Sequence, residues 1–172
     1  YGRDGAVIAR ALQLAGSSLE ELRPAQEAAL LAISLGGSFS FPHPLVRSTV
    51  VYGALCSERR AAHAAVAGAS TSDSSTWHAA LAAPGPDERI AASLEDVAGR
   101  ALSRHANSAA ARALELAARL SPARAKRARR LVGAAEAAAL AGHIYAAIDH
   151  AEAALPELDE GGSRAAAELL LG

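Results

Sequence analysis

The histidine and cysteine side chains are the groups of this sequence most able to do chemistry. The six histidines are spread along the whole chain, at His43, His63, His78, His105, His143 and His150. His143 and His150 lie two helical turns apart and can share one face, but no third ligand is near them, so we expect two surface side chains and no metal site. Cys56 follows the apolar segment Tyr52-Gly-Ala-Leu and is expected to be a buried small side chain, not a nucleophile.

Motifs of the common catalytic sites are missing from the sequence. It contains no GxxxxGK[ST] phosphate loop, no GxSxG turn and no HExxH helix. A single cysteine excludes an internal disulfide and a Cys₄ or Cys₂His₂ zinc site, and it fits a reducing cytosol. We therefore predict a cytoplasmic, non-enzymatic chain that holds no cofactor or metal itself. An enzyme that uses His43 or Cys56 is the alternative from another class.

One short run contains the densest group of charges: Arg124, Lys126, Arg127, Arg129 and Arg130. It opens a predicted helix, where the helix macrodipole disfavours cations, so we expect acidic neighbours to compensate. Because no aromatic residue interrupts the run, a solvated surface is favoured over a nucleic-acid or partner patch, which stays the alternative. The whole chain has 17 basic and 18 acidic residues, so no global field draws it to nucleic acid or to an anionic membrane. No apolar run is long enough to span a membrane.

The composition predicts closely packed helices. Hydrophobic residues make up 51% of the chain, but 47 of the 172 residues are alanine and only 3% are aromatic. Alanine is the strongest helix former and is depleted in strands. The fold class we expect is mainly α, without an aromatic-rich β-sandwich. The chain begins with Tyr1 and contains no methionine, so we interpret it as part of a longer protein.

Residues 1–70 are predicted to form a winged-helix-like module. A helix over 5–14 is followed by a second one that starts at Ser17 or Ser18 and ends near Ile33. Period-two alternation on both sides of Gly36-Gly37 predicts a short β-hairpin, which serves as the wing. A helix over 45–55 and another capped by Ser57 complete the module. Its net charge is zero within residues 1–80, which argues against DNA reading.

The rest of the chain is predicted to be helical, after a linker. Residues 71–86 form this linker, which contains a short helix over 77–83 between a polar stretch and Pro84-Gly85-Pro86. Residues 87–172 then form tetratricopeptide-like antiparallel helix pairs, with turns at Ser121-Pro122, Gly142 and Pro156. The expected helices span 87–104 with Asp87 as cap, 107–120, 123–141, 144–155 and 163–171.

A repeat of small residues supports these helix pairs. The same spacing of four and three residues recurs at an offset of 37, in Ala110, Leu114 and Ala117 and again in Ala147, Ala151 and Ala154. Small side chains at these positions let two helices approach closely, and tetratricopeptide repeats have a period of about 34 residues. Two such units are too few for a stable solenoid, so we expect further repeats beyond residue 172.

Five short motifs follow one another along the chain: Phe39-Ser-Phe-Pro-His43-Pro44-Leu45-Val46-Arg47-Ser48, Val51-Tyr52-Gly53, Glu58-Arg59-Arg60-Ala-Ala-His63, Trp77-His78-Ala79-Ala80 and Pro84-Gly85-Pro86-Asp87. In this order they resemble the large ATP-binding LuxR-family transcriptional regulators of actinobacteria. Each is weak alone, whereas their order is fairly specific, and the resemblance covers most of the chain. The sequence departs from the family at Pro42, where a basic residue usually precedes the histidine.

The resemblance implies a function in transcription regulation. In that family a nucleotide-binding domain precedes such a winged helix, helical repeats act as the sensor, and a C-terminal helix-turn-helix binds DNA. The chain would be the middle segment, which couples the nucleotide-binding domain of the same protein to repeats that bind a protein or small-molecule effector. ATP or ADP and DNA would be bound only by domains outside these residues. A stand-alone helical-repeat scaffold for protein–protein interaction is the alternative.

His43 and Arg47 are the candidate nucleotide-sensing residues. Pro42 and Pro44 fix the backbone on both sides of His43, at the start of a predicted helix. The order His-Pro-Leu-Val-Arg is similar to the His-Asp-Leu sequence in winged helices of related signalling ATPases, where the histidine contacts the nucleotide phosphate. This resemblance implies that His43 contacts the β-phosphate of ADP. The alternative is a histidine that only caps the helix and packs beside Phe41.

Overall fold

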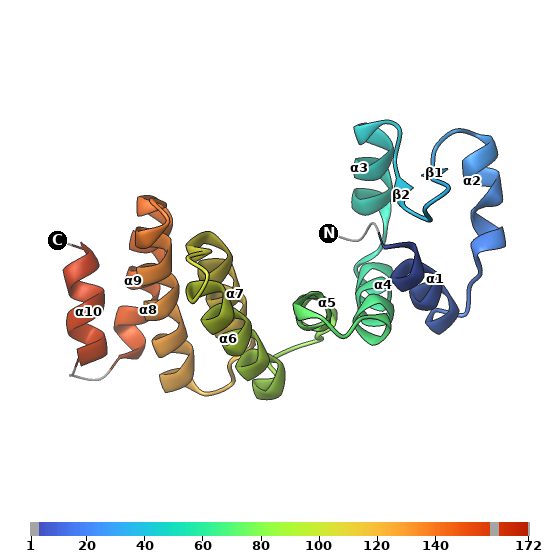
Figure 1. The fold of residues 1–172 in the computed structure, drawn as a ribbon. Coiled ribbons are helices and arrows are strands. Elements are labelled where there is room, and N and C mark those ends of the chain that lie inside the picture. Colours follow the sequence, from blue (N-terminus) through green and yellow to red (C-terminus); the bar gives the residue numbers. More distant parts are fainter. Residues whose placement is uncertain (1–3, 159–161, 172) are drawn as a thin grey trace. The chain divides into compact units, whose positions relative to one another are not determined.

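The computed structural model describes residues 4–158 and 162–171, and it is mainly helical (Figure 1). The chain divides into two compact units, Tyr1–Ala82 and Ala83–Gly172. The division falls inside the range 71–86 that was predicted as a linker. None of the helices in the described part of the chain is both long and apolar enough to cross a membrane.

The first unit contains a short hairpin among helices, in the order expected for a winged-helix module. Strand β1 pairs antiparallel with β2, with Ala32 opposite Ser40 and Ile33 opposite Phe39. The predicted hairpin is therefore confirmed. The elements are α1 (Gly5–Leu14), the 3₁₀ helix η1 (Leu19–Leu22), α2 (Arg23–Glu27), β1 (Ala32–Ile33), β2 (Phe39–Ser40), α3 (Pro44–Gly53), α4 (Cys56–Ala69) and α5 (Asp73–Ala82).

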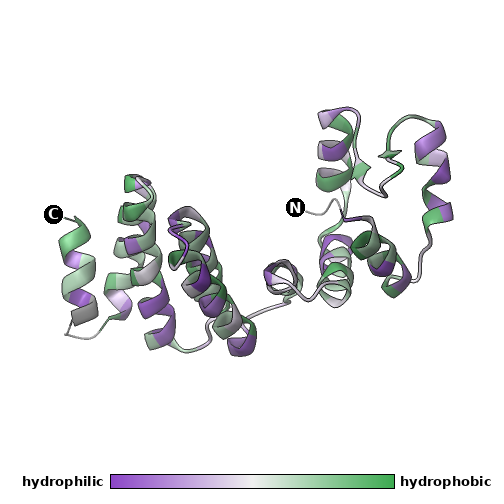
Figure 2. Ribbon diagram, in the orientation of Figure 1, coloured by the Kyte–Doolittle hydropathy of each residue, from purple (hydrophilic) through white to green (hydrophobic). Residues whose placement is uncertain are grey.

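Packing in the first unit centres on α4, which lies against α1 and against α5. The helix α5 starts at Asp73, earlier than predicted, and belongs to this unit because it packs on α4. Few side chains here are fully buried: Ala11 and Ala80 are, but no residue of α3 or α4 is. Figure 2 shows apolar turns on α3, and several of these side chains are exposed to solvent.

Two predicted boundaries in the first unit are wrong. The second helix ends at Glu27 and not near Ile33, because Ala29 adopts a positive φ of 53° and the chain turns there into β1. The cap of α4 is also misplaced, since the helix begins at Cys56 and Leu55 is its N-cap residue. The Glu58 carboxylate accepts a hydrogen bond from the Leu55 backbone N–H at 2.7 Å, which replaces the expected cap by Ser57.

The second unit is a row of helices in which each packs against the next (Figure 1). Short turns reverse the chain between them, and Gly142, with a φ of +78°, ends α8. Its N–H and that of His143 donate to the carbonyls of Ala139 and Ala138, which closes the last turn. The predicted antiparallel pairs are confirmed. Their helices are α6 (Glu88–Leu102), α7 (Asn107–Leu120), α8 (Arg124–Leu140), α9 (Ile144–Ala154), the 3₁₀ helix η2 (Leu155–Glu157) and α10 (Gly162–Leu171).

Alanine makes this close packing of helices feasible. Side chains on most sides of α7 are buried, because α6 and α8 both pack against this helix. A core cluster farther along the unit joins Val132 and Ala135 of α8 to Ala151 and Ala154 of α9 and Ala167 of α10. Methyl groups at such positions bring backbones together and keep helix propensity high.

Candidate functional site

His43 lies at the first turn of α3, where the sequence predicted a helix start. It is the N-cap residue, and its Nδ1 accepts a hydrogen bond from the Leu45 backbone N–H at 3.2 Å. The capping role weighed as an alternative is therefore present. Because Nδ1 is the acceptor, the neutral ring carries its proton on Nε2, and this atom remains available to donate to another group.

Arg47 follows His43 by one helical turn, and both side chains are exposed. Residues four apart on a helix share a face, so the structure brings the two predicted residues to the same end of α3. Apolar side chains of the same helix are also exposed: Leu45 by 67%, Val50 by 57% and Tyr52 by 82%. Exposed apolar side chains together with polar groups on the same helix are typical of a protein contact region.

The six predicted repeat-packing residues are all buried in the second unit. They occupy matching positions, since Ala110 is the fourth residue of α7 and Ala147 the fourth residue of α9. The N-terminal ends of these two helices are also close, because Ser108 Oγ lies 3.0 Å from His143 Nε2. The buried set is Ala110, Leu114, Ala117, Ala147, Ala151 and Ala154.

The basic run at the start of α8 is compensated by acidic residues, as the macrodipole argument predicted. Lys126 pairs with Glu88 at 2.9 Å, and Arg127 pairs with Glu157 at 2.6 Å. Arg129 pairs more loosely with Glu95, at 3.5 Å. The run therefore joins α8 to α6 and to η2. Hydrogen bonding to the Glu157 carboxylate raises the pKa of Arg127, so this pair keeps its charge.

Arg130 contradicts the expectation of a solvated surface, because its side chain is only 2% exposed. Nε donates to Glu95 and Nη2 to Glu88, both at 2.9 Å, while Nη1 donates to Glu88 at 3.1 Å and to the Ser121 hydroxyl. The Ser121 hydroxyl in turn donates to the Ala117 carbonyl at 2.8 Å. This guanidinium therefore links α6, the turn after α7, and α8.

The two acidic partners of Arg130 lie on one face of α6, because seven residues separate Glu88 from Glu95. Hydrogen bonds from Arg130, and next from Lys126, lower the pKa of Glu88 to about 2. This carboxyl group is therefore ionised throughout the physiological range. Five charged side chains thus form one network that joins α6 to α8: Glu88, Glu95, Lys126, Arg129 and Arg130.

The low pKa of Glu88 predicts acid sensitivity of the second unit. A carboxyl pKa of 4.5 in the unfolded chain and about 2 in the folded one stabilises the folded state above pH 4.5, and this stabilisation is lost as the pH falls towards 2. We expect Glu88→Gln to reduce the fall in melting temperature between about pH 7 and pH 3. Circular dichroism melts measure this, with Glu136→Gln, an exposed carboxylate of the same unit, as control. An unchanged pH profile in Glu88→Gln would contradict the network.

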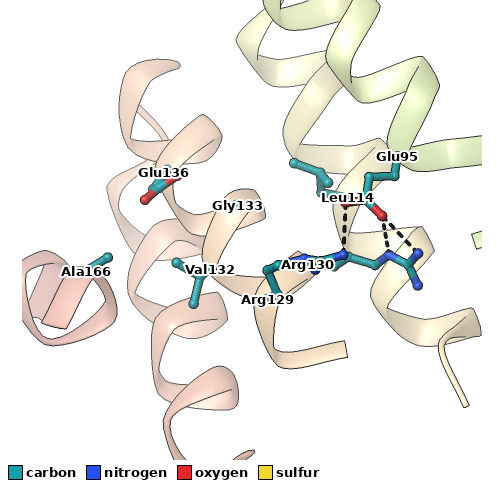
Figure 3. A pocket seen from close by; sticks show the side chains of 8 residues that line it. All are labelled: Glu95, Leu114, Arg129, Arg130, Val132, Gly133, Glu136 and Ala166. Atoms are coloured by element: carbon teal, nitrogen blue, oxygen red, sulfur yellow. Dashed lines mark hydrogen bonds and ion pairs between the residues drawn. The ribbon is translucent and has the colours of Figure 1, made fainter. Parts of the chain in front are cut away.

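A pocket of about 370 Å³ lies beside this network, lined by residues of α6, α7, α8 and α10. In Figure 3 the Arg130 side chain extends toward Glu95, with Leu114 beside it. Leu114, Val132 and Ala166 give the pocket an apolar wall, and Arg129 and Glu136 add charges. At Gly133 a Cβ would come within 3.3 Å of Leu114 Cδ1, so glycine lets α8 approach α7 there.

The exposure of Cys56 and the contact between two histidines were not predicted from the sequence. Cys56 is exposed and not buried, because it opens α4 at the surface, and its Sγ accepts a hydrogen bond from Arg59 at 3.3 Å. His63 and His78 meet between α4 and α5, with 2.8 Å between their Nδ1 atoms. Sequence reasoning missed this pair because fifteen residues separate the two histidines. The only sequence signal for this contact was that the two histidines lie on consecutive helices.

Groups that bind metals do not converge in the described part of the chain, where no three His, Cys, Asp or Glu side chains cluster. The predicted sensing residues and the basic run thus lead to one candidate region in each unit. The first is the surface around His43 and Arg47, and the second is the pocket beside Arg130. When the chain is compared with known proteins, no protein-family model, no curated protein and no solved structure matches it.

Proposed function

We propose that this chain is a non-catalytic regulatory segment of an ATP-dependent transcriptional regulator similar to the LuxR family. In this proposal the first unit contacts a nucleotide-binding domain of the same protein, and the second unit is the helical-repeat sensor. The observation that carries it is the set of exposed apolar side chains on α3, with His43 at the N-terminal end of this helix. Such a surface favours a function in contacts between domains.

The exposed side chains of α3 support a contact with another domain, because its apolar residues are not packed into a core of the first unit. Leu45 and Tyr52 are mostly exposed, and no residue of α3 is fully buried. A partner domain that covered Tyr52 and its apolar neighbours would remove this area from water, at about 25 cal/mol per Å². The two-unit chain thus has a surface that fits a further domain.

The position of His43 supports a role beside a nucleotide. Nδ1 is occupied by the Leu45 N–H, which orients the ring, so Nε2–H is the donor that can reach a phosphate oxygen. The exposed Arg47 guanidinium, one turn away, adds a cation for the same anion. We assign ADP to this contact, with the histidine holding the regulator in its resting state.

The second unit supports the sensor half of the proposal. The pocket beside Arg130 has an apolar wall and a charged rim, which suit a protein segment or a small molecule as effector. DNA binding is assigned to a separate C-terminal domain, because residues 1–80 carry six basic and six acidic side chains and no net charge.

The test of the proposal separates the capping role of His43 from its nucleotide contact. Asparagine is a strong N-cap residue but is too short to replace Nε2, so His43→Asn should keep the melting temperature of the 172-residue chain. In the full-length protein the same variant should release ADP faster and raise basal transcription. His43→Ala should show both effects and also lose about 1 kcal/mol of stability with the cap.

The outcome also decides between the regulator and the stand-alone scaffold. If His43→Asn leaves ADP release and basal transcription at their wild-type values, the histidine is only a cap and the nucleotide contact is wrong. A full-length protein without any nucleotide-binding domain would favour the scaffold, and ADP binding to it, measured by calorimetry, would then be absent.

A further inference from the structure

His63 of α4 and His78 of α5 form a direct histidine–histidine contact. Their Nδ1 atoms are 2.8 Å apart and their ring centroids 5.0 Å apart, with the planes tilted by 35°. The centroid distance nearly equals the Nδ1 distance plus the two ring radii, so the two nitrogens point at each other. Two lone pairs that point at each other do not converge on a metal ion. The contact is therefore an N–H···N hydrogen bond that needs one proton between the two rings.

This shared proton leaves one nitrogen of His63 free for a ligand. Its Nδ1 faces His78, so Nε2 is the atom that can reach the pocket that His63 lines together with Cys56, Arg59, Arg60 and Leu81. His78 accepts or donates at Nδ1 and orients the His63 ring, as carboxylates and carbonyls do for other functional histidines. Burial lowers the pKa of both rings, and the pKa of His78 is also lowered by repulsion from His63.

The pocket has a volume of about 400 Å³, and its charged groups are all basic. Arg59 is held in place, since it donates to the Val51 carbonyl at 3.2 Å and to Cys56 Sγ at 3.3 Å. Arg60 is exposed and makes no hydrogen bond or ion pair with any residue that the structure describes. Leu81 supplies an apolar wall.

Carboxylates that would neutralise these cations do not line the pocket. On α4, Glu58 does not line the pocket, and its carboxylate accepts a hydrogen bond from the Leu55 N–H at 2.7 Å. On α5 the titratable group besides His78 is Asp73, at the far end of the helix, and α1 carries Arg10. Neither Asp73 nor Arg10 lines the pocket.

We propose that this pocket binds a phosphoryl group, with Arg60, Arg59 and His63 Nε2 as the donors and His78 as the residue that positions His63. Two guanidiniums and an imidazole around one open pocket match the oxygens of a tetrahedral dianion. The site is separate from the His43 surface and does not depend on the proposed function. Anion binding favours the imidazolium form of His63, so the bound chain takes up a proton.

The experiment is an NMR titration of the 172-residue chain with sodium sulfate at constant ionic strength. Sulfate stands in for the phosphoryl group because it stays a dianion across the pH range used. We expect a saturable shift of the His63 ring nitrogens and tighter binding at about pH 6 than at about pH 7.5. Arg60→Gln should weaken binding about tenfold, the value of one charge-assisted hydrogen bond. Arg10→Gln, which removes the same charge from α1, should leave it unchanged.

Two further variants test the positioning role of His78. Gln can still accept a hydrogen bond from His63, so His78→Gln should bind sulfate nearly as the wild type does. His78→Leu removes the partner and should weaken binding, while the pH dependence remains because His63 still takes up the proton. If His78→Leu does not fold, His78→Gln and Arg60→Gln still test whether the pocket binds the anion.

Separate arms with inorganic phosphate and phenyl phosphate at about pH 7.5 identify the source of the group. Tighter phenyl phosphate binding assigns the site to a phosphate ester whose apolar part contacts Leu81, and tighter inorganic phosphate binding assigns it to the free ion. Either result supports a phosphoryl site. The proposal is overturned if sulfate leaves the His63 resonances unchanged, if Arg60→Gln and Arg10→Gln bind sulfate equally, or if acetate binds as tightly as sulfate.

Discussion

Replacing Arg130 with alanine is expected to destabilise the second unit by about 3 kcal/mol, the lower end of the range for breaking a buried ion pair. The reason is that Glu88, Glu95 and the Ser121 hydroxyl lose their shared donor, while the Arg130 side chain is 2% exposed. The lower end applies because the two carboxylates keep side-chain exposures of 30% and 37%, so water reaches them. Urea denaturation followed by circular dichroism measures the loss.

The adjacent arginine is the matched control for this prediction. Arg129 is 61% exposed and meets Glu95 at 3.5 Å, so Arg129→Ala should cost less than about 1 kcal/mol. The fluorescence of Trp77, the single tryptophan, reports on the first unit and should give the same transition in both variants. Equal losses in the two variants would show that Arg130 has no special role in joining α6 to α8.

Replacing Ala117 with leucine is expected to cost about 1–3 kcal/mol, the usual penalty for overpacking a filled core. Ala117 is fully buried in α7, which packs against both α6 and α8. Leucine has nearly the helix propensity of alanine, so the loss would come from the larger side chain and not from the backbone. The free energy of unfolding from urea titrations measures it.

An exposed alanine of the same helix separates packing from propensity. Ala109→Leu places the same side chain on the surface of α7 and should change stability by less than about 0.5 kcal/mol. If Ala117→Leu unfolds at the same urea concentration as Ala109→Leu, the small residues of the repeat are not at close helix contacts.

The helices of the second unit could be predicted because adjacent residues in the sequence determine where each helix begins and ends. Asp87 caps α6 by accepting from the N–H groups of Arg89 and Ile90, and α7 spans the predicted 107–120. Gly142 supplies the positive φ that ends α8. Caps and turns depend on a few adjacent residues, so a single sequence is enough to locate them.

The first unit was predicted less well because its signals are not local. The second helix ends early because Ala29 takes a positive φ, which no pattern of apolar residues indicates. Cys56 was expected to be buried because its neighbours are apolar, yet α4 begins there at the surface. The burial of a side chain depends on which other segments of the chain pack against it, and few residues pack against Cys56.

For the charged side chains too, features set by adjacent residues could be predicted, and features set by distant residues could not. The macrodipole argument predicted that acidic residues compensate the basic run, but it could not select Arg130 as the buried member. That choice depends on Glu88 and Glu95, which come from another helix about forty residues earlier. The position of His43 at a helix start, by contrast, followed from Pro42 and Pro44 beside it.

Amide hydrogen exchange of α3 tests the central proposal, a contact between the first unit and a nucleotide-binding domain, most directly. In the 172-residue chain no residue of α3 is fully buried, so its amides should exchange quickly. In the full-length protein with ADP, the backbone amides of α3 after Pro44 should exchange at least about tenfold more slowly, while those of α7 stay the same. Equal exchange rates of α3 in the two proteins would contradict the contact and leave the helical-repeat scaffold as the function.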